Sequence, residues 1–160
     1  MKSIVSLALR AFTDPGLAPT RLTASQAVVN SQLQSLALLG ARLYVAQVFF
    51  LSGLTKLRDW SSTLALFNDI YQVPLLPPTA AAYLGTAGEL VLPVLLVAGL
   101  AGRFAGAGLF VVNLMAVLSL SADDLSPAAQ AQHALWGVLA LAVVLWGAGR
   151  WSVDRVIRVV

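Results

Sequence analysis

Four long apolar blocks, nearly free of charge, constrain the fold more than any other feature of this sequence. They cover residues 36–57, 80–100, 104–120 and 131–147. A hydrocarbon core of about 30 Å needs roughly 17–25 helical residues, and each block has that length. Because backbone groups in lipid must pair within their own segment, each block is expected to be a helix. Charged residues make up only 11% of the chain, against roughly a quarter in soluble domains. We therefore predict an all-α fold, a bundle of four transmembrane helices.

The connections refine this domain organisation. Residues 1–35 are predicted to be an N-terminal tail or interfacial segment, and residues 36–158 to be the membrane domain. Within the N-terminal segment, residues 23–34 fit either an amphipathic helix on the inner interface or a poorly ordered tail. Ser126 followed by Pro127 is typical of a helix start, so the fourth span is expected to begin there.

A short helix is predicted between the first two spans, lying on the outer membrane surface. Leu64, Phe67 and Tyr71 recur at helical spacing and would share one apolar face. Ser61 or Ser62 is expected to cap its N-terminus. The four tryptophans fall near the expected ends of spans and would form an aromatic belt: Trp60, Trp136, Trp146 and Trp151.

The net charge of +3 is interpreted as topology, and no nucleic-acid partner is expected. With the N-terminus inside, only Lys56 and Arg58 of the ten basic residues lie outside. The inner side then holds Lys2, Arg10, Arg21, Arg42, Arg103, Arg150, Arg155 and Arg158, and the outer loops hold Asp59, Asp69, Asp123 and Asp124. The positive-inside rule therefore places both termini in the cytoplasm.

The residue types that are absent limit the chemistry. The chain has no cysteine and one histidine, His133. Thiolate metal sites and disulfides within the chain are excluded, and a bis-histidine haem or a zinc site is not expected. No metal site and no covalently bound cofactor is therefore predicted. Any electron transfer would need a diffusible carrier or a partner protein.

Glu89 is the most informative polar residue in the spans. It lies nine residues into the second block, about 13 Å deep, where a carboxylate is costly unless it is paired, solvated or protonated. Pro93 also removes the N–H that would bond the Glu89 carbonyl. We expect Glu89 to face the bundle interior within reach of Arg42, Gln47 or Asn113. It would accept or relay a proton, or it would form an internal pair that only fixes packing.

Two further ionisable residues lie toward the outer ends of spans. Lys56 closes the first span and His133 begins the fourth. Lys56 would line the entrance of a site or extend to the headgroups. His133 would transfer protons, since its pKa lies near neutrality, or would bond a loop carbonyl. Together the predicted catalytic residues are Glu89 and His133, and the predicted substrate-binding residues are Arg42, Gln47, Lys56 and Asn113.

The sequence resembles the DoxX family of small bacterial membrane proteins over about residues 36–158. The resemblance rests on the order and spacing of several segments: Arg42-Leu43-Tyr44, Phe49 to Leu57, Phe67 to Tyr71, Val73 to Pro78, Gly88-Glu89-Leu90 with Pro93, Gly99 to Arg103, and Gly149 to Asp154. The Val73-Pro74 loop and Gln132-His133 are most similar to the subgroup found beside metal-dependent peptide-modifying enzymes.

The resemblance implies four helices in a bacterial cytoplasmic membrane and a redox-related role, because family members are associated with quinone-linked oxidation. The leading hypothesis is a membrane redox accessory protein that binds a quinone and works with a protein partner. Two alternatives stay open: a non-catalytic membrane scaffold, and a small transporter or export helper for a metal or peptide. Whether the chain is itself an enzyme, and whether it forms a homo-oligomer, stay open as well.

Overall fold

The computed structural model describes residues 24–120 and 125–157, which form six helices and no strand. These helices are α2 (Ala24–Arg58), α3 (Trp60–Asp69), α4 (Pro78–Ala98), α5 (Gly102–Leu118), α6 (Pro127–Trp146) and α7 (Val153–Val156). The chain divides into two compact units after Leu33. Only residues 24–33, the start of α2, are described in the first unit, and all other described residues belong to the second. Residues 1–23, with Asp123, Asp124 and Arg158, lie outside the described residues.

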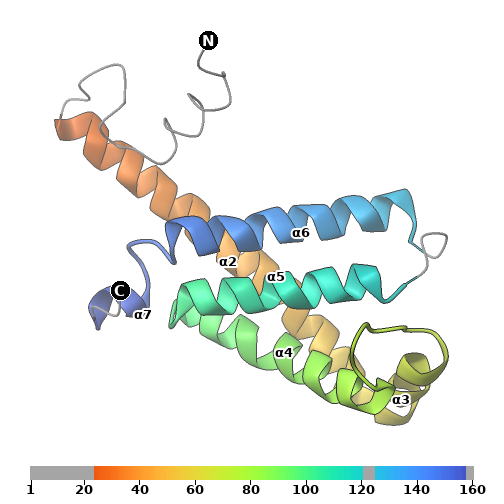
Figure 1. Ribbon diagram of the computed structural model, residues 1–160. Helices are drawn as coiled ribbons and strands as arrows, with labels where there is room; N and C mark the ends of the chain where they lie inside the picture. The colour runs from red at the N-terminus through yellow and green to blue at the C-terminus, as the bar shows by residue number, and fades with distance from the viewer. Residues whose placement is uncertain (1–23, 121–124, 158–160) are drawn as a thin grey trace. The chain divides into compact units, whose positions relative to one another are not determined.

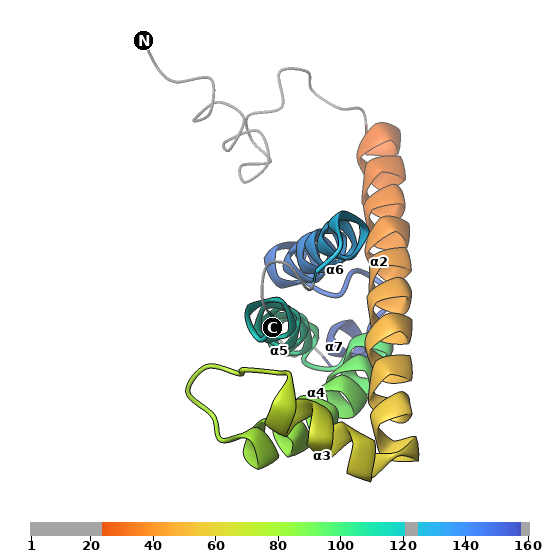
Figure 2. The same ribbon diagram turned by 90° about the vertical axis from the view of Figure 1, so that its right-hand side faces the viewer.

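The helices α4, α5 and α6 form one layer, with α5 between the other two, and α2 crosses behind it (Figure 1, Figure 2). The core where α2 meets this layer consists of small and branched apolar side chains, among them Val45, Leu96, Leu109 and Val143. A second cluster around Phe67 and Ala82 joins α3 to α4.

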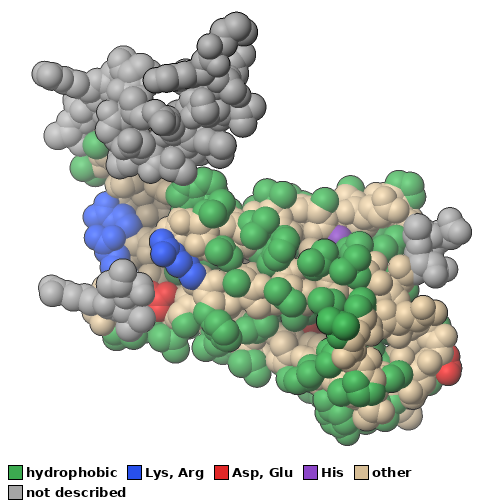
Figure 3. Space-filling model, viewed as in Figure 1, with side chains coloured by type: hydrophobic (Ala, Val, Ile, Leu, Met, Phe, Trp, Pro, Cys, Tyr) green, Lys and Arg blue, Asp and Glu red, His purple; other side chains and the backbone are tan. Residues whose placement is uncertain are grey.

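The predicted membrane spans are largely confirmed. Three helices, α2, α4 and α6, are long and apolar enough to cross a membrane, and α5 is a shorter apolar helix of 17 residues. Apolar side chains cover much of the visible surface of the bundle, while lysine and arginine gather near α7 (Figure 3). Exposed Val91, Val94 and Leu145 are typical of this surface. Such a surface suits lipid, so the chain is a multi-pass helical membrane protein.

Helix ends follow local sequence signals. The Ser126 hydroxyl accepts a hydrogen bond from the backbone N–H of Ala129 at 3.2 Å, and Pro127 begins α6, as predicted. At the turn between α4 and α5, Gly99 adopts a left-handed conformation with φ of 65°. A residue with a Cβ atom would be strained there, so glycine allows α4 to end sharply.

The start of the first span was placed too late. The helix α2 begins at Ala24 and runs without a break through residue 36, in agreement with the helical alternative for residues 23–34. No proline or glycine lies between residues 24 and 39 to stop it.

The expected cap of α3 was also wrong. Asp59, not Ser61 or Ser62, caps the helix, accepting from the backbone N–H of Ser62 at 3.0 Å. Hydrogen bonds from Ser62 and Ser61 lower the pKa of Asp59 to about 2, so the cap is ionised at neutral pH. The expected apolar face of α3 is confirmed, because Phe67 is buried and Leu64 and Tyr71 pack around it.

Candidate functional site

An ion pair joins α2 to the middle of α4. The Lys56 ammonium lies 2.9 Å from Glu89 Oε1 and 2.7 Å from Oε2, and it also donates to Ser52 Oγ at 2.9 Å. The Glu89 side chain is 10% exposed and that of Lys56 is 21% exposed. Lys56 therefore points back along α2 into the bundle, and Glu89 faces the interior as predicted.

Gly53 makes this pair sterically accessible. A Cβ atom at Gly53 would lie 2.8 Å from Leu90 Cδ2 and 3.1 Å from Glu89 Cβ. Both distances are shorter than ordinary side-chain contacts, so a larger residue at this position would force Leu90 and Glu89 to shift. One helical turn later, Lys56 reaches the carboxylate across the same contact.

The expected partners of Glu89 were therefore wrong. Arg42 is 1% exposed and lies beside the C-terminal end of α4 and the segment before α7. Its guanidinium donates to the carbonyls of Leu96 at 2.8 Å and Val97 at 2.6 Å, in the last turn of α4. The same group donates to the carbonyls of Ala148 at 2.5 Å and Trp151 at 2.9 Å.

Arg42 thus satisfies carbonyls that a helix end leaves without partners. A cation at the C-terminus of a helix is also electrostatically favourable. At the same end, the Asp154 carboxylate accepts from the backbone N–H groups of Ala101 at 2.6 Å and Gly102 at 2.8 Å, at the start of α5. Polar contacts thus join several segments at this end of the bundle, and none of the other predicted site residues takes part in them.

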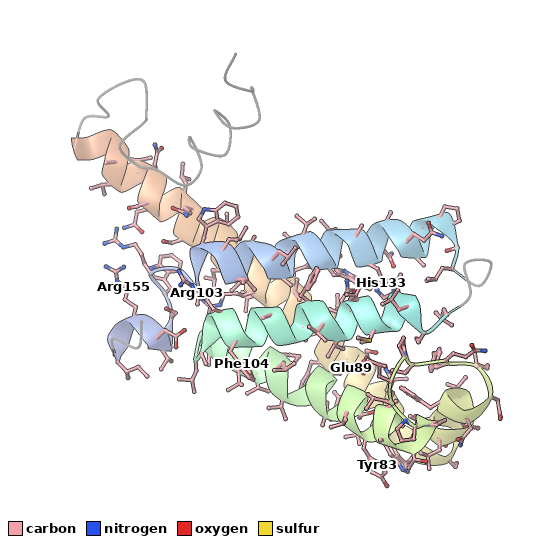
Figure 4. All side chains as sticks on the ribbon, viewed as in Figure 1. Tyr83, Glu89, Arg103, Phe104, His133 and Arg155 are labelled. Atoms are coloured by element: carbon pink, nitrogen blue, oxygen red, sulfur yellow. The ribbon has the colours of Figure 1, made fainter. Side chains whose placement is uncertain are left out.

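The second polar pair links α5 to α6. Asn113 Oδ1 lies 2.8 Å from Nδ1 of His133, and Asn113 Nδ2 donates to the His133 carbonyl at 2.9 Å. Gly137 provides the space for Asn113, because a Cβ atom there would lie 3.3 Å from Nδ2. Figure 4 shows His133 and Glu89 in the same half of the bundle, the half that α3 closes.

A cavity of about 470 Å³ lies between these two pairs, and we call it the α3-end cavity. Its polar lining residues are Ser52, Lys56, Tyr71, Glu89, Ser119, His133 and Trp136, and most of the remaining lining is apolar. Its volume falls within the range of roughly 300–1,000 Å³ typical of small-molecule sites. The loop after α3 closes one side, where the Gln72 N–H donates to the Ser119 carbonyl at 2.8 Å.

The cavity reaches the lipid-facing surface. Leu84 of α4 and Val111 of α5 both line it, yet Leu84 is 60% exposed and Val111 is 50% exposed. Leu76, in the loop before α4, also lines it and is exposed. Apolar residues that are both lining and exposed mark a mouth that opens toward lipid.

The predicted site residues are only partly brought together. Lys56, Glu89 and His133 line the α3-end cavity, and Asn113 lies directly behind His133. Neither Arg42 nor Gln47 lines the cavity, and the Gln47 side chain is exposed on the surface of α2. Their predicted substrate-binding role therefore gains no support from the geometry.

Sequence reasoning missed Trp136 and Ser52. Trp136 was expected in an interfacial belt, but it lies midway along α6. Its ring packs edge-on against the Phe49 ring, and the two ring centroids are 6.0 Å apart. It also contacts the His133 ring, 4.9 Å between centroids. The three-residue spacing from His133 was the signal that could have found it. Among the described residues, the Trp136 Nε1 atom is buried with no hydrogen-bond partner, as is the Thr86 hydroxyl.

Comparison with known families supports the resemblance seen in the sequence. Comparison with curated proteins and with solved structures returns no significant match. The profile of the DoxX family matches residues 37–122, which is more than half of the chain. The match includes most of α2 and all of α3, α4 and α5, and so contains the Lys56–Glu89 pair and Asn113; it ends before α6 and His133. With this match and its apolar helices, the chain belongs to the DoxX family of membrane proteins.

Proposed function

We propose that the protein is a membrane redox accessory protein that binds a carrier of the quinone class in the α3-end cavity and works with a partner enzyme. The single observation that carries this proposal is a cavity with an apolar lining, polar groups at its ends and a mouth toward lipid. A quinone is a polar ring on an apolar tail and is dissolved in the bilayer. It would enter through the mouth near Leu84 and Val111, with its ring between Glu89 and His133.

The residues of the cavity suit proton transfer rather than electron transfer. Reduction of a quinone to a quinol takes up two electrons and two protons. The electrons would come from a redox centre of the partner, since this chain has no cysteine and one histidine. Glu89 and His133 would accept and pass protons at the two ends of the ring, and Lys56 would hold Glu89 in place.

A cavity-filling variant tests the proposal directly. Ala116 lines the cavity on α5, so the Ala116→Leu side chain would occupy part of the quinone site. Ala107→Leu is the matched control, because Ala107 lies on the same helix and is exposed. The wild-type protein and both variants are purified in mild detergent, and the extracted lipids are analysed by mass spectrometry.

We expect quinone to co-purify with the wild-type protein and with Ala107→Leu, and to be lost from Ala116→Leu. Equal quinone in both variants, or none in the wild-type protein, would contradict the proposal. Proteins in the same extract are identified in parallel, because the proposal also requires a partner.

One observation favours the scaffold alternative. The Lys56–Glu89 pair is satisfied within the chain, as a purely structural pair would be. Under this alternative, Ala116→Leu would retain both the partner and the partner's activity. The transporter alternative has no comparable observation: no three His, Cys, Asp or Glu side chains gather as a metal site within residues 24–120 and 125–157.

A further inference from the structure

Asn113 determines where His133 carries its ring proton. The backbone carbonyl of His133 can only accept, so the amide of Asn113 must turn its Nδ2 toward that carbonyl. This orientation turns Oδ1 toward the ring, 2.8 Å from Nδ1. Oδ1 also can only accept, so Nδ1 must carry the proton. In the neutral ring Nε2 is then a hydrogen-bond acceptor, and it has no partner among the described residues.

Two donors that line the cavity, the Lys56 ammonium and the Ser119 hydroxyl, are already occupied. The Lys56 ammonium has three N–H groups, and it makes three hydrogen bonds, one to Ser52 and two to Glu89. The Ser119 hydroxyl donates to the Ala116 carbonyl at 3.0 Å. The Trp136 N–H has no partner among the described residues, but it is buried and so not exposed to a ligand.

The acceptors, by contrast, keep free capacity. The Glu89 carboxylate has about four lone-pair positions; Lys56 occupies two of them, and the Ser52 hydroxyl also hydrogen-bonds the carboxylate. Nε2 of His133 adds another acceptor. The Tyr71 hydroxyl can donate or accept and so favours neither kind of ligand. A ligand in this cavity therefore meets acceptors that require a donor.

We propose that the α3-end cavity binds a ring that carries a hydroxyl group, a phenol or a hydroquinone, more tightly than the corresponding ring whose oxygen can only accept. One hydroxyl donates to His133 Nε2, and the second hydroxyl of a hydroquinone donates to Glu89. A quinone carbonyl would instead face the lone pairs of both groups. The inference rests on the proposed function and adds that the cavity binds the reduced carrier, the quinol, more tightly than the oxidised one, the quinone.

The test uses ligands without quinone redox chemistry. A 4-alkylphenol and its methyl ether share one ring and one alkyl chain, but only the phenol can donate a hydrogen bond. Their affinities for the purified full-length protein are measured by titration calorimetry. An unpaired buried acceptor is costly, so we expect the phenol to bind about tenfold more tightly or better.

Variants assign the preference to His133. His133→Phe keeps a ring but removes the acceptor, so the affinity ratio should fall to about one. Asn113→Leu is a second variant in case His133→Phe does not fold: it frees the His133 proton to move to Nε2 and should lower the ratio too. Val138→Ala, at a lipid-facing position of α6, should leave the ratio unchanged.

The outcomes separate this inference from the proposed function. If phenol and ether bind equally well, or if His133→Phe and Asn113→Leu keep the tenfold ratio, the inference is overturned while the cavity remains a binding site. If neither ligand binds the wild-type protein, the inference and ligand binding by the cavity both fail. Tight phenol binding with a ratio that depends on His133 supports both.

Discussion

Removing the two members of the Lys56–Glu89 pair one at a time should have unequal effects on stability. At 2.7 Å the gross attraction is about 6 kcal/mol for an effective dielectric constant of about 20, and desolvation of both ions offsets much of it. The Glu89 side chain is 10% exposed in the middle of α4. It cannot reach the headgroups if Lys56 is lost, so Lys56→Met should cost about 3–5 kcal/mol.

Glu89→Gln should cost less. Lys56 lies two residues from the end of α2, and its side chain is already 21% exposed. It can turn outward to water or headgroups, or keep one hydrogen bond to the amide oxygen. A loss of about 1–2 kcal/mol is expected, which is the difference between a charged and a neutral hydrogen bond.

The assay is reversible unfolding in mixed detergent micelles, followed by circular dichroism. The double variant Lys56→Met with Glu89→Met replaces both ions by apolar side chains and should lie within about 1–2 kcal/mol of the wild-type protein, since no uncompensated charge is left. The reasoning is refuted if Glu89→Gln is the more damaging single change. It is also refuted if the double variant is as unstable as Lys56→Met.

Other predictions concern the hydrogen bonds of Arg42, the membrane topology and the proposed activity. Arg42→Lys should lower the free energy of unfolding by about 2–4 kcal/mol in the same assay, because an ammonium cannot donate to four separate carbonyls; an unchanged stability would contradict this role. A cysteine at Ser62 should react with an impermeant thiol reagent in intact cells, whereas one at exposed Val156 should react only after permeabilisation, and the reverse pattern would invert the topology. Glu89→Gln should abolish partner-dependent quinone reduction in membranes, because an amide cannot exchange a proton in this way; full activity would favour the scaffold. His133→Asn should slow the reaction less, since water in the cavity can replace this relay, and a complete loss would assign His133 the larger role.

Much of the architecture could be predicted from the sequence because the bilayer imposes strict requirements. A charge-free block of about 20 residues has few options besides a spanning helix, and α4 and α6 follow this rule closely. Local signals also sufficed for the start of α6 at Ser126-Pro127. For residues 23–34 the sequence left two alternatives open, a helix and a poorly ordered tail, and the structure shows the helix from Ala24.

The candidate site was predicted less well, because pairing in three dimensions depends on how helices cross. The intramembrane position of Glu89 was enough to predict that it faces inward. It was not enough to choose Lys56 over Arg42, because that choice depends on the close approach of α2 and α4 at Gly53. Arg42 lies at the other end of the bundle, where its guanidinium donates hydrogen bonds to four backbone carbonyls.

The sequence by itself determined that this is a helical membrane protein of the DoxX family, with an inward-facing carboxylate and no cysteine ligand for a metal. These properties depend on composition and on distance along one chain segment. Only the tertiary structure decided that Lys56 pairs with Glu89, that Asn113 bonds the ring and the carbonyl of His133, and that both pairs border one cavity. Such contacts join residues 20 and 33 positions apart, and they form because glycines at Gly53 and Gly137 leave room between helices, which no local pattern specifies.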